Sequence, residues 1–304
     1  MTDLSEAAGA AAAGPPTAGE LEGRPGFDPR FLGVEVPMPE LTSGSPTVVL
    51  DYTHYSVRFR PDRRFAAVTA HGLDGARLFT LDRDDDWLLD PRLAAELQAG
   101  PAVYVDNELD RGHLVRRASV SWGRDKAEAQ RANVDSFYYT NAAPQAARFN
   151  QGRELWLGLE DFLHQHAATF DRKLVVVAGP VLDPADPPYR GINIPLRFWK
   201  VAAFIQDGQL AATGYVLDQS PLVDDLEAAF VEAGVTGIPP LGPFRTFQVP
   251  IADIGPLADV DLGALALVDR FGVAARDEAP PPPGRASTGW LPLTSLADVR
   301  LAPA

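Results

Sequence analysis

Short runs of β-favouring residues, separated by polar turns, dominate the hydrophobic pattern of this chain. Within each run, apolar residues either alternate with polar ones or stand together, as they do in strands buried on one or both faces. The runs cover residues 47–50, 55–59, 65–70, 173–177, 198–205, 211–217 and 244–250. Polar turns at 61–64 and at Asp207-Gly208 connect neighbouring runs closely enough for hairpins. The pattern therefore predicts a central antiparallel sheet.

Helical spacing is found mainly in the middle of the chain. Residues 125–133 indicate a short helix and residues 137–139 a strand. Over residues 154–168 the apolar side chains recur with helical spacing and leave Glu160 on a different face. An acidic run at 222–233 is typical of a solvent-facing helix. Together these elements predict an α+β fold, a mixed domain with a central antiparallel sheet and flanking helices.

The two ends of the chain differ from the middle. Residues 1–24 are rich in Ala, Gly and Pro and predict a disordered leader, because they lack the basic start and strongly apolar core of a secretory signal. The compartment therefore stays open between the cytoplasm and export by another route. Residues 25–275 form the expected single domain, and 276–304 a Pro-rich tail that packs back through Trp290 and Leu291. No apolar run is long enough to span a bilayer, so no membrane partner is expected.

Composition and charge narrow the function. With 304 residues and 46% hydrophobic content, the chain can bury a substantial core. Its formal charge of -14 argues against a protein that coats nucleic acid through overall charge. The segment 110–160 is different, since eight Lys or Arg stand there against six Asp or Glu, a net charge of +2. There are no cysteines, which excludes disulfides, Cys-based zinc sites and thiol nucleophiles.

One stretch, Asp110-Arg111-Gly112-His113, combines a charge pair, a flexible joint and a titratable ring. Glycine lets the backbone bend, so we expect the imidazole of His113 to face a cleft. There it can take a proton from water, and that water becomes a nucleophile toward a phosphodiester. For a histidine taken alone, packing or capping is the competing interpretation.

Amide side chains gather downstream, at Asn141, Gln145 and Asn150. Amides bond phosphate oxygens or orient bound water, and an Asn oxygen can ligate a hard cation such as Mg²⁺. Turn formation and capping are the alternative roles of Asn141 and Gln145. Upstream, the acidic run 82–87 is typical of a solvated turn, and Arg83 within it carries a planar donor fork suited to phosphate.

Four segments together point to a known family. They are Asp-Arg-Gly-His at 110–113, Phe-Tyr-Tyr-Thr-Asn-Ala-Ala-Pro-Gln at 137–145, Phe-Asn-Gln-Gly at 149–152, and Trp156 with Leu159-Glu160-Asp161. In order and chemistry they resemble the DNA/RNA non-specific endonuclease family, which includes secreted bacterial nucleases and relatives of mitochondrial endonuclease G and has a ββα-metal active-site core. The resemblance implies that residues 25–275 are an endonuclease domain that hydrolyses phosphodiester bonds of DNA and RNA with little sequence preference.

The resemblance also implies roles for individual residues. His113 would be the general base that activates water, and Asn150 the protein ligand of a Mg²⁺ ion, with Mn²⁺ as an alternative metal. Glu160 would steady a metal-bound water, and Arg83 would hold a phosphate oxygen. Asn141 would help to shape the surroundings of the metal and the phosphate.

Three further residues are expected to support this site. Gln145 would share the role of shaping the phosphate surroundings. Arg111 would either bind phosphate or pair with Asp110, and a structural role is favoured.

Two departures from the family pattern bear on these roles. Asn150 and Glu160 stand ten positions apart, against eight in the best-known members. On one straight helix, two extra residues would turn the carboxylate by roughly 200°. We therefore expect an interrupted helix at 152–154. In addition, His164 occupies the position of a frequent family arginine, and an exposed helix residue is its expected role.

Two other functions stay open beside the nuclease. One is a catalytically degenerate fold that only binds nucleic acid or protein, and the other is a phosphodiesterase for short or damaged nucleic acid. An inhibitor or another regulatory partner is also expected, because an active nuclease endangers the genome of its own cell. A homodimer is one option for the oligomeric state.

Overall fold

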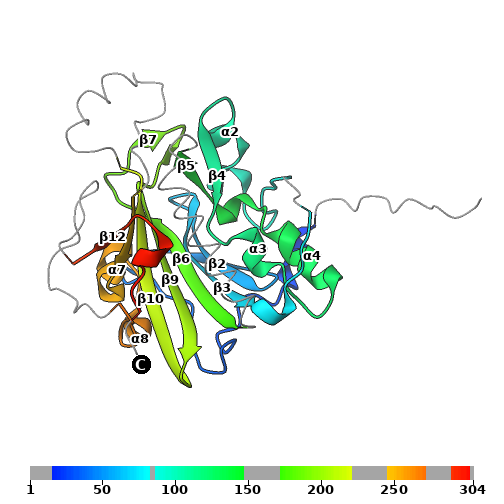
Figure 1. Cartoon of the computed structure of the whole chain (residues 1–304). Helices are drawn as coiled ribbons and strands as arrows, with labels where there is room; N and C mark the ends of the chain where they lie inside the picture. Colours follow the sequence, from blue (N-terminus) through cyan, green and yellow to red (C-terminus); the bar gives the residue numbers. More distant parts are fainter. Residues whose placement is uncertain (1–15, 83–85, 147–171, 221–244, 272–288, 302–304) are drawn as a thin grey trace, which may run out of the picture.

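A computed structural model of the chain describes residues 16–82, 86–146, 172–220, 245–271 and 289–301. Its centre is an eight-stranded sheet in the order β1-β2-β3-β6-β9-β10-β11-β12, and all neighbouring strands are antiparallel (Figure 1). The strands are β1 (Val48–Tyr52), β2 (Tyr55–Arg60), β3 (Phe65–Asp74), β6 (Lys173–Val181), β9 (Arg197–Gln206), β10 (Gln209–Asp218), β11 (Arg245–Val249) and β12 (Leu291–Leu293). The predicted α+β fold with a central antiparallel sheet is confirmed.

Every run predicted as a strand of the central sheet overlaps an observed strand. The tight turn between β9 and β10 also forms as expected, since Gln206 pairs with Gln209 across it. Both turn residues adopt left-handed backbone, with φ of 50° at Asp207 and 77° at Gly208. Two successive positive φ angles are typical of a type I′ turn, whose twist matches that of a hairpin. Residues 61–64 likewise connect β2 to β3.

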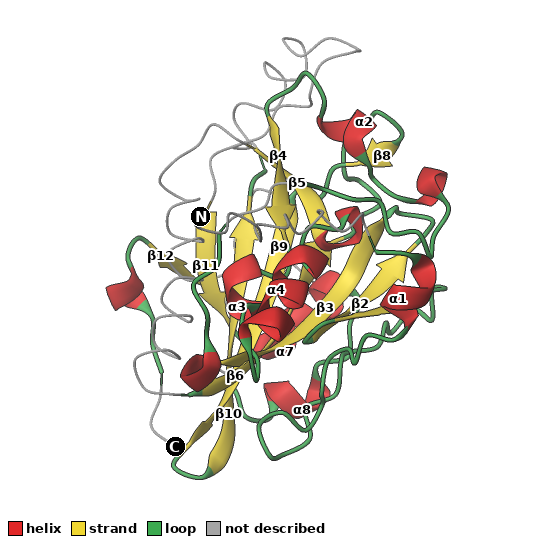
Figure 2. Ribbon diagram, turned by 90° about the vertical axis from the view of Figure 1, so that its right-hand side faces the viewer, coloured by secondary structure: helices red, strands yellow, loops and turns green. Residues whose placement is uncertain are grey.

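Helices and a small hairpin cover the two faces of the sheet (Figures 1 and 2). One face carries α3 (Arg117–Val120), α4 (Lys126–Asp135) and the hairpin of β4 (Leu109–His113) with β5 (Ala142–Ala146). The other face carries α7 (Ile251–Ala258) and α8 (Gly263–Ala266). Successive side chains of a strand point to opposite faces of the sheet. In β9, Phe198 therefore packs into the core on the β4–β5 side and Trp199 into the core beneath α7. Shorter elements are α1 (Ala18–Glu22), α2 (Pro101–Tyr104), β7 (Pro188–Tyr189), β8 (Ile192–Asn193) and the 3₁₀ turns η1 (Gly75–Arg77), η2 (Ala95–Leu97), η3 (Tyr139–Asn141) and η5 (Leu296–Asp298).

The segment predicted as a leader enters the described structure at residue 16. Helix α1 begins with a capping box in which Thr17 and Glu20 bond each other's backbone N–H. Leu21 is fully buried, and Arg24 forms an ion pair with buried Asp135 at 2.8 Å. Residues 17–24 are therefore folded against the body of the protein.

Two predictions in the middle of the chain have different outcomes. The helix predicted at 125–133 is α4, and Asp125 caps it by accepting from the backbone N–H of Glu128. The strand predicted at 137–139 is wrong. All three aromatic residues there are buried, and the segment forms a single bridge from Tyr138 to Leu88 before η3. Aromatic residues are common in strands, but this preference reflects side-chain packing, and an irregular segment that buries its aromatic side chains satisfies it equally well.

The expected return of the C-terminal tail is confirmed, since Trp290 is buried and β12 pairs with β11. The helices predicted at 154–168 and 222–233 and the break expected at 152–154 lie outside the described residues. Across the described ranges, no helix is both long and apolar enough to cross a membrane.

Candidate active site

The hairpin of β4 and β5 joins two of the four motif segments. In its register Asp110 faces Gln145, Gly112 faces Ala143, and His113 faces Ala142. The two strands are separated in sequence by α3 and α4, so the pairing brings together residues that are about thirty positions apart. The hairpin rests on the sheet through apolar side chains that belong to the buried core, Leu109, Leu114, Ala143 and Ala146.

Gly112 is needed for space rather than for a bend. It lies within β4, outside the left-handed backbone region. A Cβ atom at this position would stand 2.1 Å from Cδ of Gln145 and 2.5 Å from its Oε1. The missing side chain therefore gives room for Gln145 to cross the hairpin. This corrects the expectation that the glycine bends the chain beside His113.

Asn141 fixes the chain just beyond His113. Its Oδ1 accepts from the backbone N–H of Val115 at 2.8 Å, and its Nδ2 donates to the carbonyls of Val115 and Ser136 at 3.0 and 2.9 Å. The backbone carbonyl of Asn141 also accepts from Leu114 N–H at 2.9 Å. Since the side chain is fully buried and both amide hydrogens are used, its geometry is that of a positioning residue.

The imidazole of His113 lies among aromatic rings. Its centroid is 4.7 Å from that of Trp87, with the planes tilted by 53°, and 5.1 Å from that of Phe137 in an edge-on arrangement. Phe137 also meets Trp87 edge-on at 5.4 Å. Because the ring is held on more than one side, its orientation is restricted.

Arg111 shares this side of the hairpin. Residues two apart on a strand point to the same face, so Arg111 and His113 both reach Trp87. The guanidinium lies 5.5 Å from the centroid of the Trp87 ring. Arg111 is exposed and pairs with no acidic side chain in the described part of the chain, so the alternative pair with Asp110 does not form.

Two tyrosines border the aromatic group, Tyr139 buried and Tyr104 partly buried. Tyr104 stacks on Tyr139 at 5.8 Å, and Tyr139 lies 5.7 Å from Trp87. Burial and the neighbouring Tyr139 raise the pKa of the Tyr104 hydroxyl well above its usual range. Tyr104 therefore stays protonated and neutral at the edge of the site.

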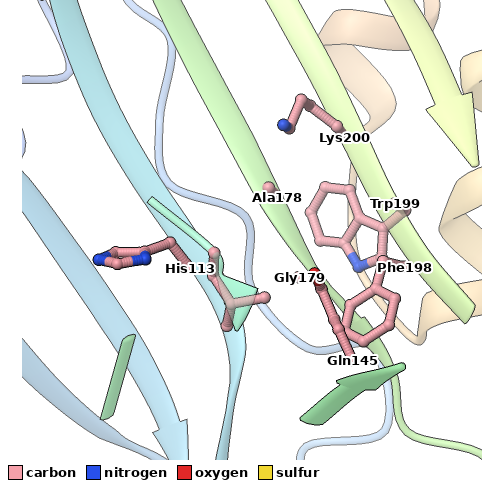
Figure 3. A pocket seen from close by; sticks show the side chains of 8 residues that line it. His113, Gln145, Ala178, Gly179, Phe198, Trp199 and Lys200 are labelled. Atoms are coloured by element: carbon pink, nitrogen blue, oxygen red, sulfur yellow. The ribbon is translucent and has the colours of Figure 1, made fainter. Parts of the chain in front are cut away.

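A small hollow lies between the hairpin and the sheet. It is lined by residues from β4, β5, β6 and β9, including His113, Gln145, Gly179 and Lys200. Figure 3 shows that the His113 ring is directed away from Trp199 and Lys200. The hollow and the imidazole therefore lie on different sides of β4, and the candidate site is on the side of Trp87.

The family is decided by sequence comparison. The family model described as "DNA/RNA non-specific endonuclease" matches residues 38–266. The chain belongs to this family. The match covers the strands β1 to β11 and the whole β4–β5 hairpin.

Relatives of the chain include both bacterial and mitochondrial proteins. The "Uncharacterized protein y4fB" of Sinorhizobium fredii is 38% identical over 256 residues, which are 77% of this chain and 38% of the relative. Mitochondrial endonuclease G of Homo sapiens is 29% identical over 185 residues, 57% of this chain and 54% of the relative. The Bos taurus protein is 30% identical over 150 residues, 45% of this chain and 47% of the relative. The chain thus spans between about two fifths and half of the length of these relatives.

A solved structure shows the same fold. It is the "Crystal structure of the EndoG/EndoGI complex: Mechanism of EndoG inhibition", and it matches with a TM-score of 0.51 at 18% identity. The match covers 70% of this chain and 84% of that chain. At this level of identity the likeness concerns the fold.

Several residues expected from the family pattern lie outside the described residues: Arg83, Asn150, Glu160 and His164. Within the described ranges, no group of three or more His, Cys, Asp or Glu side chains is arranged to hold a metal ion. The structure thus places His113 and Arg111 on one side of β4 beside Trp87, Gln145 across the hairpin on β5, and Asn141 in η3 directly before β5. The roles of Asn150 and Glu160 in metal binding remain predictions.

Sequence reasoning missed Trp87 as a site residue. It stands at the end of the acidic run 82–87, whose composition is typical of a solvated turn. The backbone of the next residue fixes the position of the indole. Leu88 N–H donates to the carbonyl of Phe137 at 3.0 Å, and the carbonyl of Leu88 accepts from Tyr139 N–H at 2.9 Å. Such a long-range bridge is not visible in local sequence.

Proposed function

We propose that this chain is a metal-dependent endonuclease that hydrolyses phosphodiester bonds of DNA and RNA with little sequence preference. The pairing of β4 with β5 carries the proposal, because it joins the Asp-Arg-Gly-His and Asn-Ala-Ala-Pro-Gln segments in one hairpin. Family membership supports the same reaction class.

His113 is the proposed general base. Its imidazole takes a proton from water as that water attacks the phosphorus, and the packed rings of Trp87 and Phe137 hold it in a fixed orientation. Asn141 fixes the backbone immediately after it. Arg111 is the proposed phosphate anchor, since its exposed guanidinium lies on the same side of β4 and presents a planar set of donors.

The donor chemistry of the motif suits a hard divalent cation. Asn150 follows β5 by four residues and offers an amide oxygen, and Glu160 offers a carboxylate that would orient a metal-bound water. When bound, Mg²⁺ would neutralise charge on the phosphate and on the leaving oxygen. Mn²⁺ satisfies the same oxygen ligands and is the alternative metal. Arg83 would hold a second phosphate oxygen.

A plasmid and a long RNA test the proposal. Wild type is expected to cut both in Mg²⁺ and to stop in EDTA, and His113→Ala and Asn150→Ala are each expected to lose about 100-fold or more of the rate. Asn107→Ala, at the opposite end of β4, is the matched control and keeps most of the activity. Equal cleavage by wild type, His113→Ala and Asn150→Ala would exclude this mechanism.

Two results would select the other functions. Binding of DNA or RNA without any cleavage by wild type indicates a catalytically degenerate binding fold. Cleavage of short oligonucleotides while plasmid and long RNA survive indicates a phosphodiesterase for short or damaged strands.

The proposal includes an inhibitor or regulatory partner. The solved structure with the same fold is a complex in which EndoG is inhibited, and a cell that holds an active nuclease needs such a control. Loss of cleavage in lysate of the producing cell, restored on purification, is the expected observation. Full activity in that lysate would contradict it.

A further inference from the structure

Trp87 is a large apolar side chain placed where it is only partly buried, directly beside His113. Its position is fixed by backbone bonds rather than by chance packing. Leu88 N–H donates to the carbonyl of Phe137 at 3.0 Å, and Tyr139 N–H donates to the carbonyl of Leu88 at 2.9 Å. A partly exposed indole held this rigidly is a preformed surface.

One of the neighbours of the indole is a long, exposed side chain, that of Arg111. Phe137 meets it edge-on, and His113 and Tyr139 lie against it at tilted angles. Among the described residues, the remaining contact of the ring is the exposed guanidinium of Arg111, 5.5 Å from the ring centroid. A long exposed side chain with no ion pair in the described part of the chain can move away at little cost.

Magnitudes favour exchange of that guanidinium for a nucleobase. A cation–π contact at an exposed site is a weak interaction. Stacking of a base on an aromatic side chain is stronger. The guanidinium, once displaced, is free to bond the phosphate of the same nucleotide.

We propose that Trp87 is the stacking surface for an unpaired nucleobase of DNA or RNA, next to the phosphodiester that His113 acts on. This inference deepens the proposed function and rests on it. A base inside a duplex has both faces covered by its neighbours, so only an unpaired or flipped-out base can use this surface. The chain should therefore bind single strands through a base as well as through phosphates.

The test compares two single strands of about eight nucleotides with the same phosphates, one natural and one abasic, in a binding assay in EDTA. Wild type is expected to bind the natural strand about tenfold more tightly, which corresponds to about 1.4 kcal/mol. Trp87→Leu should reduce this ratio below about twofold and leave the affinity for the abasic strand unchanged. Trp87→Phe should retain most of the ratio. Arg111→Gln should reduce the affinity for both strands by the same factor.

Equal affinity of wild type for the two strands would overturn the proposal without any variant. So would a Trp87→Leu chain that loses affinity for both strands equally, because the indole would then only support the hairpin. Cleavage of plasmid and RNA by wild type in Mg²⁺ is measured in parallel. If cleavage occurs and the two strands bind equally, the stacking surface fails and the nuclease stands; if no cleavage occurs, the proposed function fails.

Discussion

The amide of Asn141 pairs twice with the backbone of Val115, once through Oδ1 at 2.8 Å and once through Nδ2 at 3.0 Å. The same Nδ2 reaches the carbonyl of Ser136, at the end of α4. One buried side chain thus ties the exit of β4 to α4 and to η3. The orientation of His113, two residues before Val115, depends on this tie.

Replacement of Asn141 should harm both stability and catalysis. Asn141→Ala leaves one N–H and two carbonyls without partners in a buried place, so we expect a loss of about 3 kcal/mol in the free energy of unfolding. Asn141→Asp keeps the size but cannot donate to the two carbonyls, and it buries a charge, so its loss should be larger. Urea unfolding measures both, and kcat should fall more than KM rises.

Asn107→Ala is the matched control for this prediction. Asn107 lies before β4 and bonds Val103, Tyr189 and the N–H of Leu109, but it is only partly buried. We expect about 1 kcal/mol of destabilisation and little change in kcat. If Asn141→Ala were as stable as wild type, water or another group would have replaced the hydrogen bonds of the Asn141 amide.

Gly112 and Gln145 should behave as one unit. A methyl group at 112 would collide with Cδ of Gln145 at 2.1 Å, and the long Gln side chain can swing away. Gly112→Ala should therefore displace the Gln145 side chain from its place across the hairpin. The cleavage rate should then fall by the same factor as in Gln145→Ala. The double variant should be no worse than Gln145→Ala alone, which a double-mutant cycle detects.

Gly179→Ala provides the contrast. A Cβ atom there would stand 2.1 Å from the backbone carbonyl oxygen of Ala67 in β3, which cannot swing aside. Its loss in unfolding free energy should be about 3 kcal/mol or more, and no side-chain change should rescue it. Additive effects of Gly112→Ala and Gln145→Ala would contradict the proposed coupling.

The fold was largely predictable because its strands carry their own signals. The run of β-favouring residues around Val176 and the Asp207-Gly208 turn each predict structure from a few neighbouring residues. The site was less predictable, because its geometry comes from contacts far apart in sequence. Nothing local in Asp110–His113 shows that β4 pairs with β5, that Asn141 is buried, or that Trp87 lies against the imidazole.

Aromatic residues explain the one strand that was wrongly predicted. Phe137, Tyr138 and Tyr139 favour strands statistically, yet all three are buried in an irregular segment, and Phe137 packs against Trp87. Tyr138 lies against Tyr52, while Tyr139 lies against Tyr104 and Trp87. Packing around a turn decides the conformation here, and tertiary contacts of this kind override intrinsic preference.

His71 should make the protein sensitive to acid. Burial, with a smaller contribution from nearby Lys200, lowers its pKa from 6.5 to about 3. Well above pH 6.5 the ring is neutral in both the folded and the unfolded state. As the pH falls from 6.5 toward 3, the unfolded chain takes up the proton first, so the free energy of unfolding decreases by up to about 4 kcal/mol.

Urea unfolding of wild type and His71→Leu between pH 7.5 and 4 measures this contribution. The variant should lose less stability over that interval, and at pH 7.5 it should be at least as stable, because the Nδ1 of His71 is buried with no hydrogen-bond partner in the described residues. Parallel pH profiles for the two proteins would rule out His71 as the source.

The C-terminal segment 289–301 should stabilise the sheet although it lies beyond the family match, which ends at residue 266. Gln248 of β11 is fully buried and holds this segment, since its Oε1 accepts from Arg300 N–H at 2.8 Å and its Nε2 donates to the Arg300 carbonyl at 2.7 Å. Trp290 is buried against Phe247 and donates through Nε1 to Asp253 at 2.9 Å.

Loss of either anchor should release the segment. Trp290→Ala is expected to cost about 3–5 kcal/mol of unfolding free energy, and Trp290→Phe about 1 kcal/mol, because it keeps the ring packing and loses only the hydrogen bond. Gln248→Leu removes both bonds to Arg300 and the bond from Nε2 to Thr213 Oγ1, while the backbone pairing of β11 with β10 is kept. Limited proteolysis should therefore cut near the C-terminal end sooner than in wild type. A Trp290→Ala chain with unchanged stability and unchanged proteolysis would show that the sheet is complete at β11 without this segment.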